Sequence, residues 1–323
     1  MKREMILTLL SSLTVCSVAH VLRAESVVSN DAILRQTFDL GGERSQQTQY
    51  FLMESKLINY ALNGKRVGVD VFRLRLKCIP AKLAGTKGDE YTCTKFTVQL
   101  SGEPEVDIPS LKNWTYVFKV PPTGIDEKGR TLGIAHAPFE NLVDANGRAI
   151  PPDKKYHVYN AFIDFHSFCN IFAERIEGGK GIQDLKSIGQ KIVHAAAFSE
   201  GPVNLGSAVA KGSTFKNGEV TLEFKGLSRV AGATCAIVSF DSGESSFKMT
   251  VKPMPDMEVR TVGSSHYKGD IYIDLATNWA KKVTMDEFVV VEATLPMAPY
   301  KVNTVGERDI LIRNVSAEEF ARH

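Results

Sequence analysis

The stretch Arg66-Val-Gly-Val-Asp-Val-Phe-Arg-Leu-Arg-Leu-Lys-Cys78 decides the fold class, because apolar and basic residues alternate along its second half. Phe72, Leu74 and Leu76 lie on one side of the alternation, and Arg or Lys fills the positions between and after them. Successive residues of a strand point to opposite faces of the sheet, so the pattern predicts a half-buried strand. The valines of the first half have the opposite parity: Val67, Val69 and Val71. They indicate either burial of both faces or a bulge near Val71.

Further strand patterns lie on both sides of this stretch. Tyr50 to Leu62 precedes it, and Asn63-Gly64 between the two runs is a strong signal for a tight hairpin. Tyr91 to Leu100 and Trp114 to Val120 follow as strands, and Pro121-Pro122 ends the sheet. Residues 26–48 are polar and weakly patterned, which is typical of an arm.

The apolar period changes to three and four residues in the middle of the chain. One helix is predicted from the spacing of Phe162, Phe165, Cys169, Phe172 and Ile176, and Gly178-Gly179 ends it. Its polar positions are expected to face away from the core: Asn160, Asp164, Ser167, Asn170 and Glu174. A second helix is predicted from Ile182, Leu185, Ile188, Ile192 and Ala196.

Strand patterns return from Gly218 onward. The predicted strands are residues 220–225, Ala233 to Phe240, Ser246 to Lys252, Lys268 to Leu275 and Phe288 to Leu295. The connections are too short for a crossover helix each, so an antiparallel meander is expected. Asp309 to Val315 is expected to add an edge strand.

The predicted fold is therefore α+β and mostly β, with antiparallel sheets in two β-rich units and a helical pair between them. The expected boundaries are residues 25–155 for the N-terminal unit, 156–200 for the helical segment and 201–323 for the C-terminal unit.

The first residues have the pattern of an export signal. Lys2 and Arg3 precede an apolar run from Met5 to Val15, which is too short to span a bilayer. Small residues at Ser17-Val18-Ala19 predict cleavage after residue 19, with an alternative cut after residue 24. The expected product is a soluble exported protein, periplasmic or secreted, with no membrane span.

Four cysteines remain after that cleavage, and an even number in an exported chain indicates disulfides. The expected pairs are Cys78 with Cys93 and Cys169 with Cys235. Cys78 lies on the apolar side of its strand pattern, whereas Cys93 lies on the side of Lys95 and Thr97. The two cysteines can therefore face each other only if a bulge lies beside one of them, or if Cys78 has already left the strand.

The composition and the motifs exclude several classes of function. The 39 Lys and Arg residues nearly balance the 37 Asp and Glu residues, which gives no electrostatic case for a nucleic-acid partner. The sequence contains no His-Glu-x-x-His, no G-x-S-x-G, no phosphate-binding loop and no dinucleotide fingerprint. No cofactor and no metal site are therefore expected.

Two functions from different classes fit these observations. The rhythm of Gly269 to Asp274 and of Phe288 to Val291 resembles that of periplasmic lipoprotein-carrier folds, a resemblance of fold and not of family. It implies a non-enzymatic binding or cell-envelope interaction protein that holds a lipid or another apolar molecule against a curved sheet. The alternative is a hydrolase or metal-dependent enzyme that uses Asp164 and His166. That enzyme needs a partner from a set of three histidines: His136, His157 and His194.

Overall fold

The computed structural model describes residues 32, 34–61, 63–201, 209–254, 257–296 and 301–323. Residues 37–323 form one compact unit, and the residues before them belong to a separate one. The predicted export signal and both of its cleavage sites lie outside the described residues. No helix in the described part of the chain is long and apolar enough to cross a membrane.

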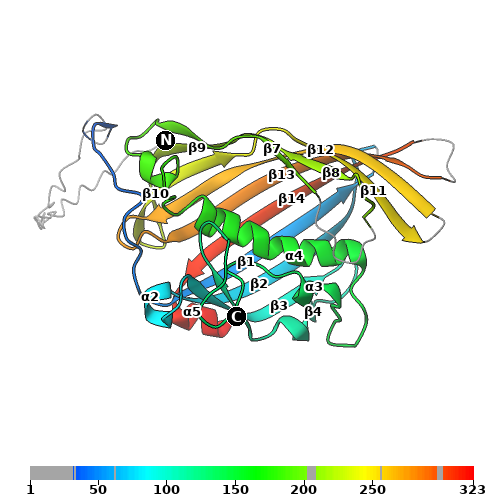
Figure 1. The fold of residues 1–323 in the computed structure, drawn as a ribbon, viewed down its shortest axis with the longest axis horizontal. Coiled ribbons are helices and arrows are strands. Elements are labelled where there is room, and N and C mark those ends of the chain that lie inside the picture. Colours follow the sequence, from blue (N-terminus) through cyan, green and yellow to red (C-terminus); the bar gives the residue numbers. More distant parts are fainter. Residues whose placement is uncertain (1–31, 33, 62, 202–208, 255–256, 297–300) are drawn as a thin grey trace, which may run out of the picture. The chain divides into compact units, whose positions relative to one another are not determined.

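The chain is mostly β (Figure 1). Before the long helix the elements are β1 (Gln49–Tyr60), β2 (Arg66–Ile79), α2 (Ala81–Ala84), β3 (Asp89–Gln99), β4 (Val106–Asp107), η1 (Pro109–Leu111), β5 (Trp114–Phe118) and α3 (Ala137–Glu140). The central segment contains α4 (Pro152–His166), a π-helical turn η2 (Ser167–Ile171) and η3 (Ile182–Asp184). The remaining elements are β6 (Lys191–Ala195), β7 (Phe198–Glu200), β8 (Thr214–Asn217), β9 (Val220–Val230), β10 (Ala233–Asp241), β11 (Ser245–Met254), β12 (Met257–Asp274), β13 (Ala280–Thr294), β14 (Lys301–Val315) and α5 (Ala317–Arg322).

The described strands form one antiparallel sheet of fourteen strands, instead of a separate sheet in each half of the chain. Its main order is β4-β3-β2-β1-β14-β13-β12-β10-β9-β6. The first and last strands of the chain, β1 and β14, pair over eleven residues and join the two halves. The prediction that Asp309 to Val315 forms an edge strand is therefore wrong, because β14 pairs with β1 on one side and β13 on the other.

The β1–β2 hairpin confirms the strands predicted on either side of Asn63-Gly64. Gly64 has a φ of 76°, a conformation that glycine adopts without steric cost, and its N–H donates to the Ala61 carbonyl. The pairing is regular from Gly68 to Cys78, so there is no bulge near Val71 on this side. Val67 is exposed and has no partner in β1, because the register shifts between Asn59 and Tyr60. Val71 and the adjacent Phe72 are both buried, so both faces of β2 are covered at that level.

Three neighbouring long strands are interrupted at the same level of the sheet. The interruptions separate β6 from β7, β8 from β9, and β10 from β11. Gly218 lies at one of them, where a Cβ atom would stand 2.4 Å from the Ser242 carbonyl oxygen. Only glycine permits this close backbone approach without a local shift.

Helix α4 lies across one face of the sheet (Figure 1), which we call the inner face. Phe162 stacks on Phe96 of β3, and Phe165 packs against Phe51 of β1. Further along, Phe168 of η2 stacks on Phe240 of β10. The apolar stripe predicted for the first helix therefore crosses from β3 to β10 and closes the core.

The second predicted helix, built on residues 182–196, is wrong. The chain makes only the 3-10 turn η3 and then enters strand β6, which pairs with β9. Gly189 lies between the two elements with a φ of 85°, and its N–H donates to the Phe224 carbonyl. The helix-like spacing arises because a turn and a strand each direct apolar side chains into the same core. The helical pair between two units is consequently a single long helix.

Two similar turns cover the β3 side of the sheet. Residues 125–131 and 143–149 share the pattern of a β-branched residue followed by Asp, two variable residues, Gly and Arg. Asp126 accepts hydrogen bonds from the backbone N–H groups of Lys128 and Arg130, and Asp144 has the same two contacts with Asn146 and Arg148. The first turn leads into a bridge between Leu132 and Val117 of β5, and the second donates from Ala145 to β4. The turns thus protect an edge that would otherwise expose unpaired backbone groups.

The predicted disulfides are absent, since all four described cysteines are free and buried. A bulge does lie between Arg75 and Leu76, but it places Cys93 opposite Leu76 and Cys78 opposite Tyr91. Cys235 pairs with Asp274 and Ser228 on neighbouring strands, whereas Cys169 lies in η2. The thiols therefore fill core positions as small apolar groups.

Candidate functional site

Helix α4 begins after Pro151, where Pro152 occupies the first helical position and needs no hydrogen-bond partner. It continues directly into the π-helical turn η2, and this longer helical segment directs three polar side chains into the core: Asp164, His166 and Asn170. The prediction that Asp164 and Asn170 face away from the core is therefore wrong. Each buried polar group needs a partner, and each has one.

Asp164 forms an ion pair with Arg308, a residue of the sheet. Arg308 of β14 binds the Asp164 carboxylate through Nη1 and the Glu287 carboxylate of β13 through Nε, the latter at 2.7 Å. The three side chains are each about nine-tenths buried. Burial raises the pKa of Asp164 to about 6, although the positive charge of Arg308 opposes that rise.

His166 points elsewhere and does not meet Asp164. Its Nδ1 lies 2.9 Å from the Asn170 amide oxygen, and its Nε2 lies 2.8 Å from the Tyr116 hydroxyl. The ring stacks on Phe118 with a centroid distance of 3.9 Å. Burial lowers the pKa of His166 to about 3, so the ring is neutral at physiological pH.

The other three histidines predicted as partners are also occupied separately. His136 pairs with the Tyr159 hydroxyl, His157 packs on Phe72, and His194 packs on Phe172. Among the described residues, no group of three His, Cys, Asp or Glu side chains is arranged to hold a metal ion. Asp164, His166 and these three histidines therefore contact separate partners and are not brought together among the described residues.

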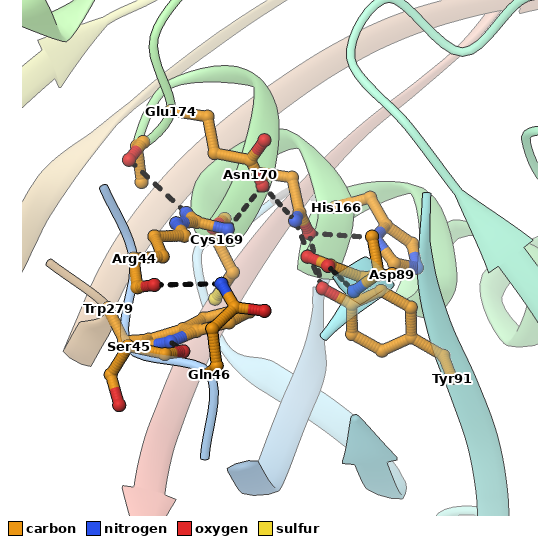
Figure 2. Close-up of polar contacts among 12 residues, drawn as sticks. Arg44, Ser45, Gln46, Asp89, Tyr91, His166, Cys169, Asn170, Glu174 and Trp279 are labelled. Carbon is orange, nitrogen blue, oxygen red and sulfur yellow. Dashed lines mark hydrogen bonds and ion pairs between the residues drawn. The ribbon is translucent and has the colours of Figure 1, made fainter. Parts of the chain in front are cut away.

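A chain of buried hydrogen bonds runs from His166 toward the surface (Figure 2). The Asn170 amide group donates 2.5 Å to Glu174 and 3.0 Å to the Tyr91 hydroxyl. Because Asn170 accepts from Nδ1 of His166, Nε2 accepts from Tyr116. Every member has a partner, and such fully satisfied networks rigidify a core.

Arg44, from the predicted arm, closes this chain. Its guanidinium group binds Glu174 and donates to the backbone carbonyls of Cys169 and Ala173, at 2.6 and 3.2 Å. It also stacks on Trp279, with 4.3 Å to the ring centroid. These contacts satisfy carbonyl groups near the end of the helical segment, where no intrahelical donor remains. Sequence reasoning missed Arg44 because nothing in a polar, unpatterned arm distinguishes it.

The surface around Arg44 contains a polar hollow of about 350 Å³. Its lining includes Asp89, Glu174, Asn278 and Trp279, together with arm residues 40–44. Burial raises the pKa of Asp89 to about 6, the Glu174 charge adds to the rise, and Arg44 opposes it. We call this the polar hollow.

A second hollow, of about 450 Å³, lies beside the end of η2 and the residues that follow β5. Its lining residues are Val120, Pro121, Pro122, Ile171, Ile176 and Glu177. Five of the six are apolar, and we call this the apolar hollow. Residues 120–122, which follow β5, form one part of the lining, and Ile171 at the end of η2 with Ile176 and Glu177 forms the rest.

Comparison with known proteins does not identify the chain. No family model matches the sequence, and no curated protein matches it. A search of solved structures found OmpTdeltaL8, a loop L8 deletion mutant of OmpT, an outer membrane protein of Vibrio cholerae. The alignment covers 83% of this chain and 99% of that chain at 8% sequence identity, with a TM-score of 0.14. A score this low supports no argument about fold or function, so function is inferred from the chain's own residues.

Proposed function

We propose that this chain is an exported, non-enzymatic binding protein that holds an apolar small molecule in the apolar hollow. The observation that carries the proposal is the lining of that hollow, in which Glu177 is the single charged residue among the six. Its volume of about 450 Å³ lies within the range typical of small-molecule sites. Burial of apolar surface would supply most of the binding free energy.

The position of the hollow follows from how the core is filled. Phe162 of α4 packs against Phe96 of β3 and Trp114 of β5, so aromatic side chains already occupy the space between helix and sheet. An apolar ligand is therefore placed beside the end of the helical segment, and not between α4 and the curved sheet as the sequence suggested.

The walls of the hollow are held by partners outside it. Ile171 ends η2, which Arg44 anchors through the Cys169 carbonyl. Val120 follows β5, which pairs with β3 from Trp114 to Phe118. A site on such fixed elements requires little ordering when a ligand binds, and less conformational entropy is then lost.

Binding of a fluorescent fatty-acid probe tests the proposal. The matched variants are Val120→Asp, which introduces a charge into the hollow, and Val67→Asp, which introduces the same charge at a position 62% exposed and outside it. We expect Val120→Asp to weaken probe binding at least tenfold and Val67→Asp to leave it unchanged. Circular dichroism confirms that both variants are folded. Equal affinity in both variants, or no saturable binding to the original protein, would contradict the proposal.

Export is proposed on the sequence pattern of residues 1–19 alone. Expression of the full chain in a bacterium and N-terminal sequencing of the periplasmic fraction test it. We expect a mature N-terminus at His20, or at Glu25 if the second site is cut. A folded product that retains Met1 and stays in the cytoplasm would contradict export without affecting the binding experiment.

A further inference from the structure

The polar hollow contains more hydrogen-bonding capacity than the protein uses. The Arg44 Nε and the Asn278 Oδ1 are both buried and have no partner among the described residues. Both residues line the hollow. A buried polar atom without a partner costs free energy. Asn278 Oδ1 is an acceptor that a donor group in the hollow would satisfy, whereas the Arg44 Nε–H is a donor and needs an acceptor such as water.

The charges of the hollow show what kind of group fits. Asp89 and Glu174 supply two carboxylates, and Arg44 supplies one guanidinium that already binds Glu174. Glu43, which also lines the hollow, binds Lys82 at 3.6 Å. Asp89 is then the one lining carboxylate without a salt bridge among the described residues.

Asp89 is the carboxylate that lacks a cation. Its Oδ1 accepts one hydrogen bond, from the Ala81 N–H at 2.8 Å, and no salt bridge to Asp89 is found in the described part of the chain. Burial, and to a smaller extent the neighbouring Glu174 charge, raise the pKa of Asp89 to about 6, and the Arg44 charge opposes this rise only in part. A cation placed beside Asp89 would favour its ionised form and lower its pKa.

The size and lining of the hollow favour an organic cation over a metal ion. About 350 Å³ is far larger than an ion needs, and no described cluster has the three side-chain ligands of a metal site. Apolar contacts are available along one wall from Leu40, Pro80 and Trp279. A primary amine combines three N–H donors with an apolar stem.

We infer that the polar hollow binds a small primary ammonium compound, with the amine beside Asp89 and the Asn278 carbonyl and its alkyl stem against Trp279. This site is separate from the apolar hollow, and neither inference depends on the other.

Trp279 provides a local readout. Its indole N–H donates 2.9 Å to the Ser45 carbonyl beside the hollow, whereas the only other tryptophan, Trp114, packs on Tyr116 and Phe139 in the core. The two indole N–H resonances can be followed by NMR while the protein is titrated at pH 8 with n-butylamine, n-butanol or butyrate. The three probes share the alkyl stem and differ in charge.

We expect n-butylamine to shift the Trp279 resonance saturably and leave that of Trp114 in place. Butanol and butyrate should bind at least tenfold more weakly. Asp89→Asn removes the charge of the carboxylate that has no salt bridge but keeps the acceptor for Ala81, and it should weaken amine binding at least tenfold. Asp153→Asn, at an exposed position on α4, is the matched control and should leave amine binding unchanged. Equal responses to amine and butanol, unchanged binding in Asp89→Asn, or no shift at all would overturn the inference and leave a hollow filled by water.

Discussion

Arg308→Met is expected to be among the most damaging single substitutions in this protein. Within the described part of the chain, Arg308 is the one cation bound to the two buried carboxylates Asp164 and Glu287. Met has a similar length and fills the space, so the variant tests the charge and not the packing. Removal of one partner from a buried ion pair costs about 3–5 kcal/mol, because it leaves an uncompensated charge. Here two carboxylates lose their partner together, which places the loss at the upper end of that range.

The loss should depend on pH with a definite sign. Burial and the Glu287 charge raise the pKa of Asp164 above its value in the unfolded chain, and the variant lacks the Arg308 charge that opposes this rise. A group with a raised pKa in the folded state is destabilising above that pKa and is neutral when protonated at lower pH. We therefore expect the difference in unfolding free energy between original and variant to be largest at pH 8 and clearly smaller at pH 5.

Urea unfolding followed by tryptophan fluorescence measures this difference, since Trp279 is buried. Arg260→Met is the matched control, because Arg260 is 73% exposed and its bond to Glu258 spans 2.7 Å on the surface. An exposed pair of this kind contributes about 0–1 kcal/mol. The reasoning is refuted if Arg308→Met unfolds within 1 kcal/mol of the original protein at pH 8, or if its loss grows as the pH falls.

Three further predictions concern other parts of the chain. Asp126→Ala should lower the melting temperature more than Asp126→Asn, because Asn keeps an acceptor for the backbone N–H groups of Lys128 and Arg130. The same order is expected at Asp144. Calorimetry that finds the Ala and Asn variants equal at both positions would contradict the capping role of the two aspartates. Asp89→Asn should stabilise the protein relative to the original by up to about 3 kcal/mol more at pH 8 than at pH 4, since the raised pKa of Asp89 makes its ionised form unfavourable. Denaturation at both pH values checks this, and a constant difference would contradict it. A thiol reagent should modify none of Cys78, Cys93, Cys169 and Cys235 in the native protein and all four after denaturation. Failure to modify any of these four in unreduced denatured protein would indicate a disulfide.

Local pattern was sufficient to predict most of the strands. The alternation in 72–76 and the Asn63-Gly64 turn predicted the β1–β2 hairpin, because strand period and turn chemistry are properties of neighbouring residues. The alternation in 220–225 likewise predicted part of β9. The pairing of β1 with β14 could not be predicted in this way, since it joins residues more than 240 positions apart and depends on which edges remain unpaired.

The errors in the middle of the chain have a common cause. Ile182, Leu185 and Ile188 follow a helical spacing, but each is directed into the core by a different local conformation. Asp164 and Asn170 lie on the polar side of that pattern, and they are nevertheless buried because Arg308 and Glu174 provide partners. A sequence pattern records polarity, whereas burial depends on partners contributed by distant strands.

The candidate sites were harder to predict than the fold. Asp164 and His166 attracted attention because a carboxylate and an imidazole lie close in sequence, but residues two apart on a helix point in different directions. Arg44 and Asp89, which line the polar hollow, come from an arm and from the start of a strand. They have no motif in common, and only the folded chain brings them to one hollow.

The most direct test of the binding function is native mass spectrometry of the protein purified from the exported fraction, combined with organic extraction of the same sample. Retention of one apolar molecule per chain by the original protein and by Val67→Asp, and its loss from Val120→Asp, is the predicted result. Original protein that is entirely free of ligand, and that also fails to take up a fatty acid added before the measurement, would contradict the account.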